Sequence, residues 1–100
     1  MYEIDPDRID LAREFRRGIY GRHSGELQRV LNRMRGGDNN GRYVLLHTVP
    51  GHFLLARMGA RRGDPITPVP DYVFHSVEEA EWTVFKLRWK ELTGRDLAVD

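Results

Sequence analysis

The feature that most constrains this chain is a helix near its end that is apolar on two sides. The segment from Ser76 to Glu79 has the pattern of a capping box, in which the serine caps the helix and the glutamate occupies its third position. The helix is predicted to run to about Leu92 and to end before Gly94, because glycine favours the position after a helix. With about 100° between successive residues, its apolar residues form two stripes, and both need cover.

The two stripes differ in composition, so we expect them to have different neighbours. The aliphatic stripe, which we expect to cover a sheet, consists of Val77, Ala80, Val84 and Leu87. The aromatic stripe consists of Trp82, Phe85, Trp89 and Leu92. Large aromatic side chains commonly anchor protein interfaces, so we expect the aromatic stripe to bury into a larger subunit or a second copy of the chain. The alternative is that N-terminal helices fold back and bury it within the monomer.

Two shorter helices are predicted upstream. Asp5, followed by a proline, suits the start of a helix over Pro6–Arg17 that Gly18 ends. Its apolar residues on one side are Ile9, Ala12 and Phe15. Ser24 is a suitable N-cap for a second helix over Gly25–Arg35. The apolar residues of that helix recur at helical spacing and are Leu27, Val30, Leu31 and Met34.

A hairpin is predicted in the middle of the chain. Residues 42–49 and 52–58 are rich in β-branched, aromatic and aliphatic residues, and Pro50-Gly51 between them suits a type II turn. We expect His47 to lie near Leu54 across the hairpin. In that register one face consists of Val44, Leu46, Thr48, Phe53, Leu55 and Arg57. Both faces are mostly apolar, so the sheet needs cover on both sides.

The remaining elements complete the fold prediction. Residues 59–70 are expected to form a proline-rich loop, and residues 71–75 a short third strand. The predicted class is α+β: two N-terminal helices, a three-stranded antiparallel meander, and a long C-terminal helix packed on the sheet. The 100 residues are expected to form one domain, with residues 1–23 as a helical arm and connector and residues 24–94 as a compact α-β-β-β-α core.

Composition excludes several classes of protein. The chain has no cysteine, which excludes disulfides, thiolate metal sites and cysteine nucleophiles. No apolar run approaches the ~18 residues that a membrane span needs, and the polar start MYEIDPDRID is not a secretory signal. We therefore expect a soluble cytoplasmic protein with no membrane partner.

The middle of the chain is basic, which raises nucleic acid as an alternative partner. Residues 8–62 contain twelve arginines and four acids. The arginines that could contact phosphates are Arg29, Arg33, Arg35, Arg42, Arg57, Arg61 and Arg62. Double-stranded RNA-binding and some DNA-binding domains have a similar order of elements. The acids Glu78, Glu79 and Glu81 at the start of the last helix disfavour this alternative.

The sequence contains no recognisable catalytic constellation. Its four histidines do not occur at metal-ligand spacing, and no HExxH pattern is present. Ser24 and Ser76 are its only serines, and both are explained as helix caps. We therefore predict no catalytic, cofactor-binding or metal-binding residue in this chain, and no enzymatic activity for the chain alone.

Several short motifs between Tyr20 and Gly94 occur together in one known family. They are Gly21-Arg22-His23-Ser24, Leu27-Gln28-Arg29-Val30, Gly41-Arg42-Tyr43, the run from Phe74 to Ala80, Val84-Phe85 and Arg88. With these motifs the chain resembles the small, alpha subunit of N,N-dimethylformamidase and its relatives.

The resemblance implies a non-catalytic accessory subunit of a bacterial amide hydrolase. In that family the larger subunit holds a mononuclear iron and hydrolyses the amide C–N bond, and the small subunit packs against it. It implies that this chain stabilises such a catalytic subunit in a hetero-oligomer and contains no cofactor or catalytic residue of its own.

Overall fold

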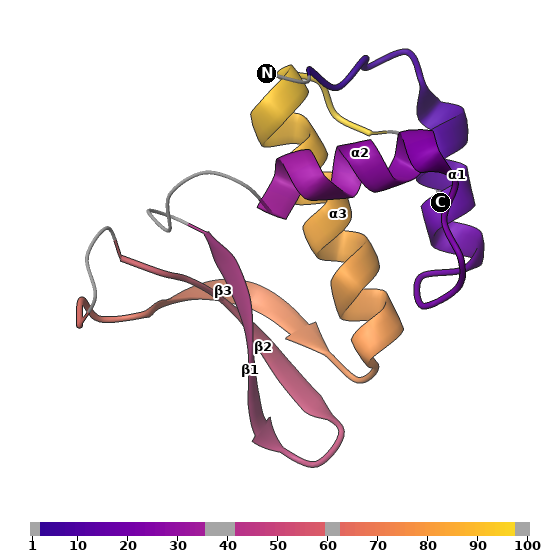
Figure 1. Ribbon diagram of the computed structural model, residues 1–100. Helices are drawn as coiled ribbons and strands as arrows, with labels where there is room; N and C mark the ends of the chain where they lie inside the picture. Colours follow the sequence, from indigo (N-terminus) through magenta and orange to yellow (C-terminus); the bar gives the residue numbers. More distant parts are fainter. Residues whose placement is uncertain (1–2, 36–41, 60–62, 98–100) are drawn as a thin grey trace. The chain divides into compact units, whose positions relative to one another are not determined.

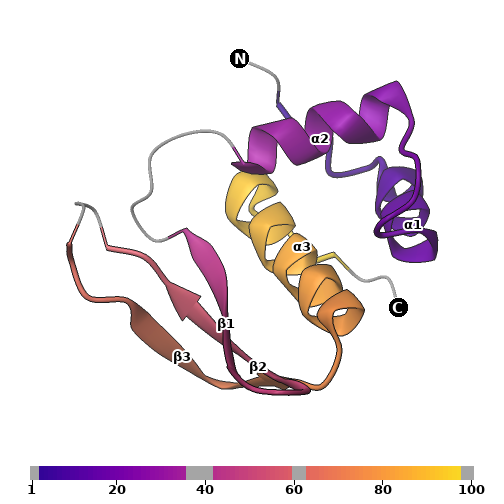
Figure 2. The ribbon, with the colours of Figure 1, turned by 60° about the horizontal axis from the view of Figure 1, so that its bottom comes forward.

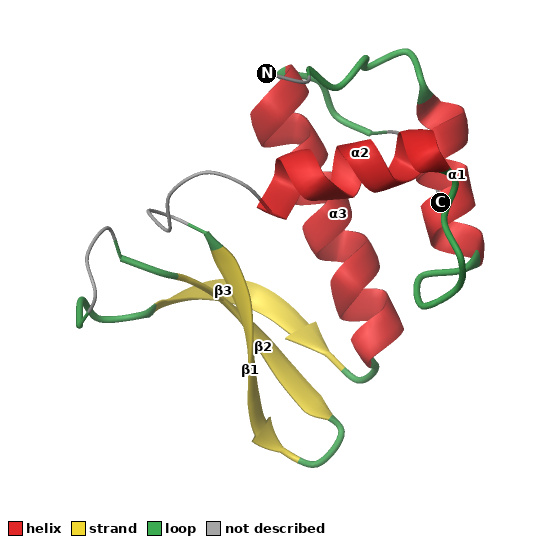
Figure 3. Ribbon diagram, in the orientation of Figure 1, coloured by secondary structure: helices red, strands yellow, loops and turns green. Residues whose placement is uncertain are grey.

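The structure, a computed structural model, describes residues 3–35, 42–59 and 63–97. In chain order the elements are α1 (Ile9–Arg17), α2 (Gly25–Arg35), β1 (Tyr43–Val49), β2 (His52–Arg57), β3 (Thr67–Phe74) and α3 (Val77–Thr93). The strands form one antiparallel sheet in the order β1-β2-β3 (Figure 1). The predicted α+β class and meander are therefore confirmed, and along the chain all three strands follow α2 and precede α3. Figure 3 colours the helices red and the strands yellow.

The chain divides into two compact units. The helical unit comprises residues 1–36 and 82–100, and the sheet unit comprises residues 37–81. This division differs from the predicted arm and core, because α1 and α2 contribute buried side chains to the same hydrophobic cluster. The prediction that α1 belongs to an arm outside the core is therefore wrong. Whether Val77, Ala80, Val84 and Leu87 cover the sheet stays a prediction.

The first helix begins three residues later than predicted, because Asp5 caps a turn instead. The Asp5 carboxylate accepts a hydrogen bond from the Asp7 backbone N–H at 2.9 Å, and the Asp5 carbonyl accepts one from the Arg8 N–H at 3.1 Å. Such local bonding is a common use of aspartate before a helix. The helix then begins at Ile9, which is 36% exposed. Its buried residues are Leu11, Ala12 and Phe15.

The other helix ends agree with the sequence signals. The Ser24 hydroxyl accepts the Leu27 N–H at 3.2 Å, and the Ser76 hydroxyl accepts the Glu79 N–H at 3.1 Å, so both serines are N-caps. Gly94 follows α3 with a φ of +77°, as expected for a C-terminal glycine. The predicted apolar stripe of α2 is buried and consists of Leu27, Val30, Leu31 and Met34.

The hairpin between β1 and β2 has a different register from the one predicted. His47 lies opposite Phe53 and Val49 lies opposite His52, so Thr48 is an additional residue in β1 that forms a bulge. The prediction that His47 lies near Leu54 is therefore wrong by one residue. Because neighbouring residues of a strand point to opposite faces, this shift exchanges the faces of β2 relative to β1.

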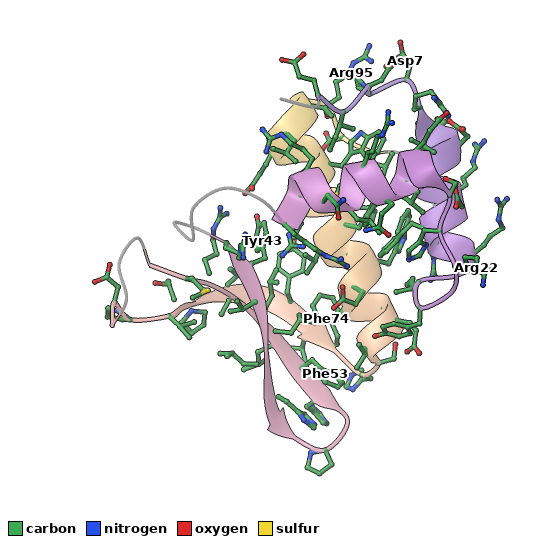
Figure 4. The ribbon with its side chains drawn as sticks, viewed as in Figure 1. Asp7, Arg22, Tyr43, Phe53, Phe74 and Arg95 are labelled. Carbon is green, nitrogen blue, oxygen red and sulfur yellow. The ribbon has the colours of Figure 1, made fainter. Side chains whose placement is uncertain are left out.

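The observed pairing defines two faces of the sheet. The mixed face consists of Tyr43, Leu45, His47, Phe53, Leu55, Arg57 and Phe74. The aliphatic face consists of Val44, Leu46, Leu54, Ala56 and Val73. Figure 4 labels Phe53 and Phe74 of the mixed face, which lie opposite each other in β2 and β3. Arg57, the one arginine among these residues, lies on the mixed face, and the aliphatic face has no charged residue.

The third strand is longer than predicted at its start. Residues 67–70 belong to β3 although they contain Pro68 and Pro70, and the prediction that they form a loop is wrong. Proline lacks a backbone N–H and is tolerated in edge strands, and β3 is an edge strand of this sheet. The ladder between β2 and β3 is irregular between Leu54 and Ala56. His75 lies just beyond the strand, at the turn into α3.

The turn between β1 and β2 provides a test of the hairpin. Gly51 has a φ of +80°, and a Cβ at this position would meet nothing within 4 Å. Gly51→Ala should lower the free energy of unfolding by about 1–2 kcal/mol, because a left-handed backbone strains a residue with a side chain. Gly25→Ala is the matched control in equally open space at the start of α2, and it should be neutral or stabilising. Urea melting of both variants measures the difference; equal effects would contradict the assigned turn.

Candidate functional site

The aromatic stripe of α3 lies in the core of the helical unit. Trp82, Phe85 and Trp89 are only 5%, 2% and 1% exposed. The prediction that these three side chains face a partner chain is therefore wrong, and the alternative, burial within the monomer by the N-terminal helices, agrees with the structure. Leu92, the fourth residue of the stripe, is 36% exposed. Its place in an interface stays a prediction.

The stripe is covered mainly by α1 and α2. The Phe15 ring stacks on Phe85 with their centroids 4.4 Å apart and their planes 14° apart. Trp82 and Trp89 lie on either side of Phe85, with centroids at 5.6 and 5.8 Å. The remaining buried members of this cluster are Ile4, Leu11, Ala12, Leu27, Val30, Leu31, Met34 and Leu97. The narrow apolar faces of two short helices thus combine to match one wide aromatic stripe.

Two cations lie close to the Trp82 ring. The Arg16 guanidinium carbon is 5.7 Å from the ring centroid, and the Lys86 amine is 5.5 Å from it. Cations at this distance from an indole face are attracted by its negative potential. These two side chains therefore give Trp82 polar neighbours within its own unit.

A carboxylate of α1 fixes the connector that leads into α2. Glu14 accepts two hydrogen bonds from Ser24, one from the backbone N–H at 2.7 Å and one from the hydroxyl at 2.8 Å. These bonds, the backbone one first, lower the pKa of Glu14. The preceding residue, His23, places its ring 5.9 Å from that of Phe15. The motif Gly21-Arg22-His23-Ser24 therefore has a structural role, which is to join the two helices.

Sequence reasoning did not identify Glu14 as a member of this arrangement. Its partner Ser24 is ten residues away, across a connector whose path no local pattern specifies. Ser24 was recognised as the N-cap of α2, and its second role follows only from the packing of α1 beside α2. His23 also has a buried Nδ1 atom without a hydrogen-bond partner among the described residues.

A polar groove of about 620 Å³ lies beside this connector. Its lining residues are Arg8, Asp10, Leu11, Glu14, Ser24, Gly25, Glu26 and Arg29. The Arg8 guanidinium binds the carboxylate of Asp10 at 3.0 Å and also that of Glu26. Hydrogen bonding to Arg8 lowers the pKa of Asp10 and correspondingly raises the pKa of Arg8. The groove thus contains exposed acidic and basic side chains that form ion pairs with one another. The pair between Arg8 and Glu26 joins the start of α1 to α2.

The predicted arginine surface is divided between the two units. Arg29, Arg33 and Arg35 lie on α2 in the helical unit, whereas Arg42 and Arg57 belong to the sheet unit. Arg61 and Arg62 lie outside the described residues.

Arg57 already has a partner on the mixed face. Its guanidinium donates a hydrogen bond to the Tyr43 hydroxyl at 2.9 Å, and its central carbon is 4.4 Å from the centre of that ring. The described geometry therefore gives Arg57 a structural role.

The aliphatic face of the sheet combines exposed and buried apolar side chains, and Ala56 is its buried member. Val73 is 51% exposed, and Val44, Leu46 and Leu54 are partly exposed. On the mixed face, Leu55 and Phe74 are buried. The core of an interface is depleted of charged residues, and the aliphatic face has this composition.

The described part of the chain contains neither a metal cluster nor a membrane-spanning helix. Within residues 3–35, 42–59 and 63–97, no three His, Asp or Glu side chains are grouped as a metal site. Within the same ranges, no helix has the length and apolar character needed to cross a bilayer.

Comparison with known proteins identifies a family that this chain matches. The model of the family described as N,N-dimethylformamidase alpha subunit matches residues 4–98. The match includes α1 as well as the region between Tyr20 and Gly94 in which the motifs were noted. No curated protein matched the chain.

The buried stripe makes a direct prediction about stability. Trp89→Ala should lower the free energy of unfolding by about 3–5 kcal/mol, the usual loss for a buried large aromatic residue. Leu92→Ala is the control on the same helix, and its exposed side chain should cost less than about 1 kcal/mol. Urea melting of the two variants measures both losses. Unchanged stability of Trp89→Ala would contradict the placement of this side chain in the core.

The Glu14–Ser24 contact predicts a pH dependence. The pKa of Glu14 in the folded chain lies below its ordinary value of 4.5, so its contribution to stability is complete above that pH and is lost as the pH falls through the folded pKa. Glu14→Gln should therefore destabilise the chain at pH 7, and the difference from wild type should shrink towards pH 3. Urea melts over this range measure it. Glu3→Gln, which removes the same charge from an exposed residue, is the control. A difference in stability between Glu14→Gln and wild type that does not change with pH would contradict the Glu14–Ser24 contact.

Proposed function

The chain belongs to the N,N-dimethylformamidase alpha subunit family, and from this premise we propose that it is a non-catalytic accessory subunit. In this proposal it packs on and stabilises a larger catalytic subunit of an N,N-dimethylformamidase-like amidohydrolase in the cytoplasm of a bacterium. The observation that carries the proposal is the match over residues 4–98, which extends across both units of the fold. The description of the family as an alpha subunit implies an enzyme of several subunits.

In this proposal the chemistry belongs to the partner. Hydrolysis of the amide C–N bond and the mononuclear iron that supports it are assigned to the larger subunit. The contribution of this chain is structural: it supplies a surface against which the catalytic subunit folds or remains folded. Binding of this kind stabilises a partner by mass action, because only the folded partner presents the matching surface.

We place the docking surface for the larger subunit on the aliphatic face of the sheet. This face combines the exposed Val73 with partly exposed Val44, Leu46 and Leu54, and its residues carry no charge. An interface core needs apolar side chains without charges that would have to be desolvated. Three of the four aromatic-stripe residues are buried in the helical unit, so the proposal rests on the sheet instead.

The proposal predicts that activity requires both subunits. The chain purified alone should show no turnover of N,N-dimethylformamide. Co-expression with a larger amidohydrolase-like chain from a neighbouring reading frame should give one complex in sedimentation, and this complex should release dimethylamine. Removing the small chain from the complex should abolish the activity, and adding it back should restore it. Turnover by the isolated chain after chelation and repurification would overturn the accessory role.

A pair of β3 variants tests the docking face separately. Val73→Asp places a charge at an exposed position of the aliphatic face and should weaken association at least tenfold, the scale of about 1.4 kcal/mol. Thr67→Asp places the same charge at an exposed position of the same strand, opposite Arg57 of the mixed face, and should associate as wild type does. Melting curves of each variant alone establish that the fold is kept. Equal association of both variants would show that the partner binds elsewhere.

A further inference from the structure

Three of the four histidines lie at one end of the sheet unit. His47 and His52 precede and follow the turn between β1 and β2, and His75 follows the end of β3. Figure 2 shows that this turn and the end of β3 are at the same end of the sheet. All three histidine side chains are exposed. The proposed function uses none of them.

Two of these histidines face each other across neighbouring strands. Phe53 lies opposite Phe74, so the next position along each strand brings His52 opposite His75. Their ring centroids are 5.0 Å apart and their planes are inclined by 82°. Side chains at directly opposed positions of an antiparallel pair are close enough to share a ligand.

This separation fits two imidazoles bound to one metal ion. Imidazole nitrogen binds Zn²⁺ at about 2.0–2.1 Å, and two such rings at a tetrahedral angle have their centres about 5 Å apart. Neutral imidazole is a ligand for Zn²⁺, Cu²⁺ and Ni²⁺ rather than for Ca²⁺ or Mg²⁺, which prefer oxygen. The imidazole chemistry of the pair therefore selects the zinc class of cation, and the 5.0 Å between the ring centres is the separation expected for two imidazoles on one such ion.

In place of the sequence-based prediction of no metal-binding residue, we propose that His52 and His75 form an open site for a divalent cation of the zinc class. Two imidazoles supply half of a tetrahedral shell, and water completes it. The described residues contain no group of three His, Asp or Glu side chains for one ion, so the site binds reversibly rather than as a closed structural centre. His47 does not take part, because its ring stacks on Phe53 at 4.8 Å and lies on the mixed face.

The proposal is tested by titrating Zn²⁺ into the full chain by calorimetry at pH 7.5. We expect one site, and we expect His52→Gln and His75→Gln each to lower its affinity by about tenfold or more. His47→Gln is the matched control and should bind as wild type does. Lowering the pH to about 5 should weaken binding, because protons compete for the imidazole nitrogens. Equal affinities of the three variants would overturn the site.

A second measurement on the unmodified chain keeps the test independent of how the variants fold. Substoichiometric Cu²⁺, which is paramagnetic, should selectively broaden the imidazole proton resonances of His52 and His75. Equal broadening of His23 and His47 would show nonspecific binding and contradict the proposal. Neither experiment requires a partner subunit. A negative result for metal binding therefore does not affect the proposed accessory role, and a negative result for the accessory role does not affect the metal site.

Discussion

The stacking of Phe15 on Phe85 is the contact on which the helical unit depends. It joins the first helix to the last across 70 positions of the sequence, with the ring centroids 4.4 Å apart. Trp82 and Trp89 extend the same aromatic surface on either side of Phe85. Such rings bury much apolar area at low cost in side-chain entropy. An exposed stripe of this size would instead favour association with other chains.

This aromatic contact requires that α1 and α2 be held in place, and polar groups supply that constraint. Glu14 binds Ser24 twice, and Ser24 in turn caps α2 through the Leu27 N–H. At the other end, Arg95 binds Asp7 at 2.9 Å, so the segment after α3 is tied to the turn before α1; both are labelled in Figure 4. An exposed ion pair of this kind contributes little free energy. Its role is to link the segment after α3 to the turn before α1.

Local sequence patterns predicted the helices and strands of this fold. The hairpin register and the extent of β3 depend on how the strands pack, and the patterns did not predict them. Ser24, Ser76 and Gly94 mark helix ends because each acts on its own neighbours, and all three were recognised from the sequence. The register of the hairpin was missed because the bulge at Thr48 is set by how β1 and β2 pair, which periodicity alone does not determine. Pro68 was taken as a loop residue because its edge position is visible only once the sheet is assembled.

The error about the aromatic stripe changes where a partner can bind. Two apolar stripes on α3 were correctly recognised, but the covering capacity of α1 and α2 was underestimated, because each helix taken alone is short and highly charged. Once both are packed around Phe85, the helical unit has used its largest apolar surface. The uncharged side chains around Val73 are then the surface with the composition of an interface core. In the proposed subunit the two tasks are separated: the helices bury their aromatic residues for stability, and the sheet is the surface proposed for assembly.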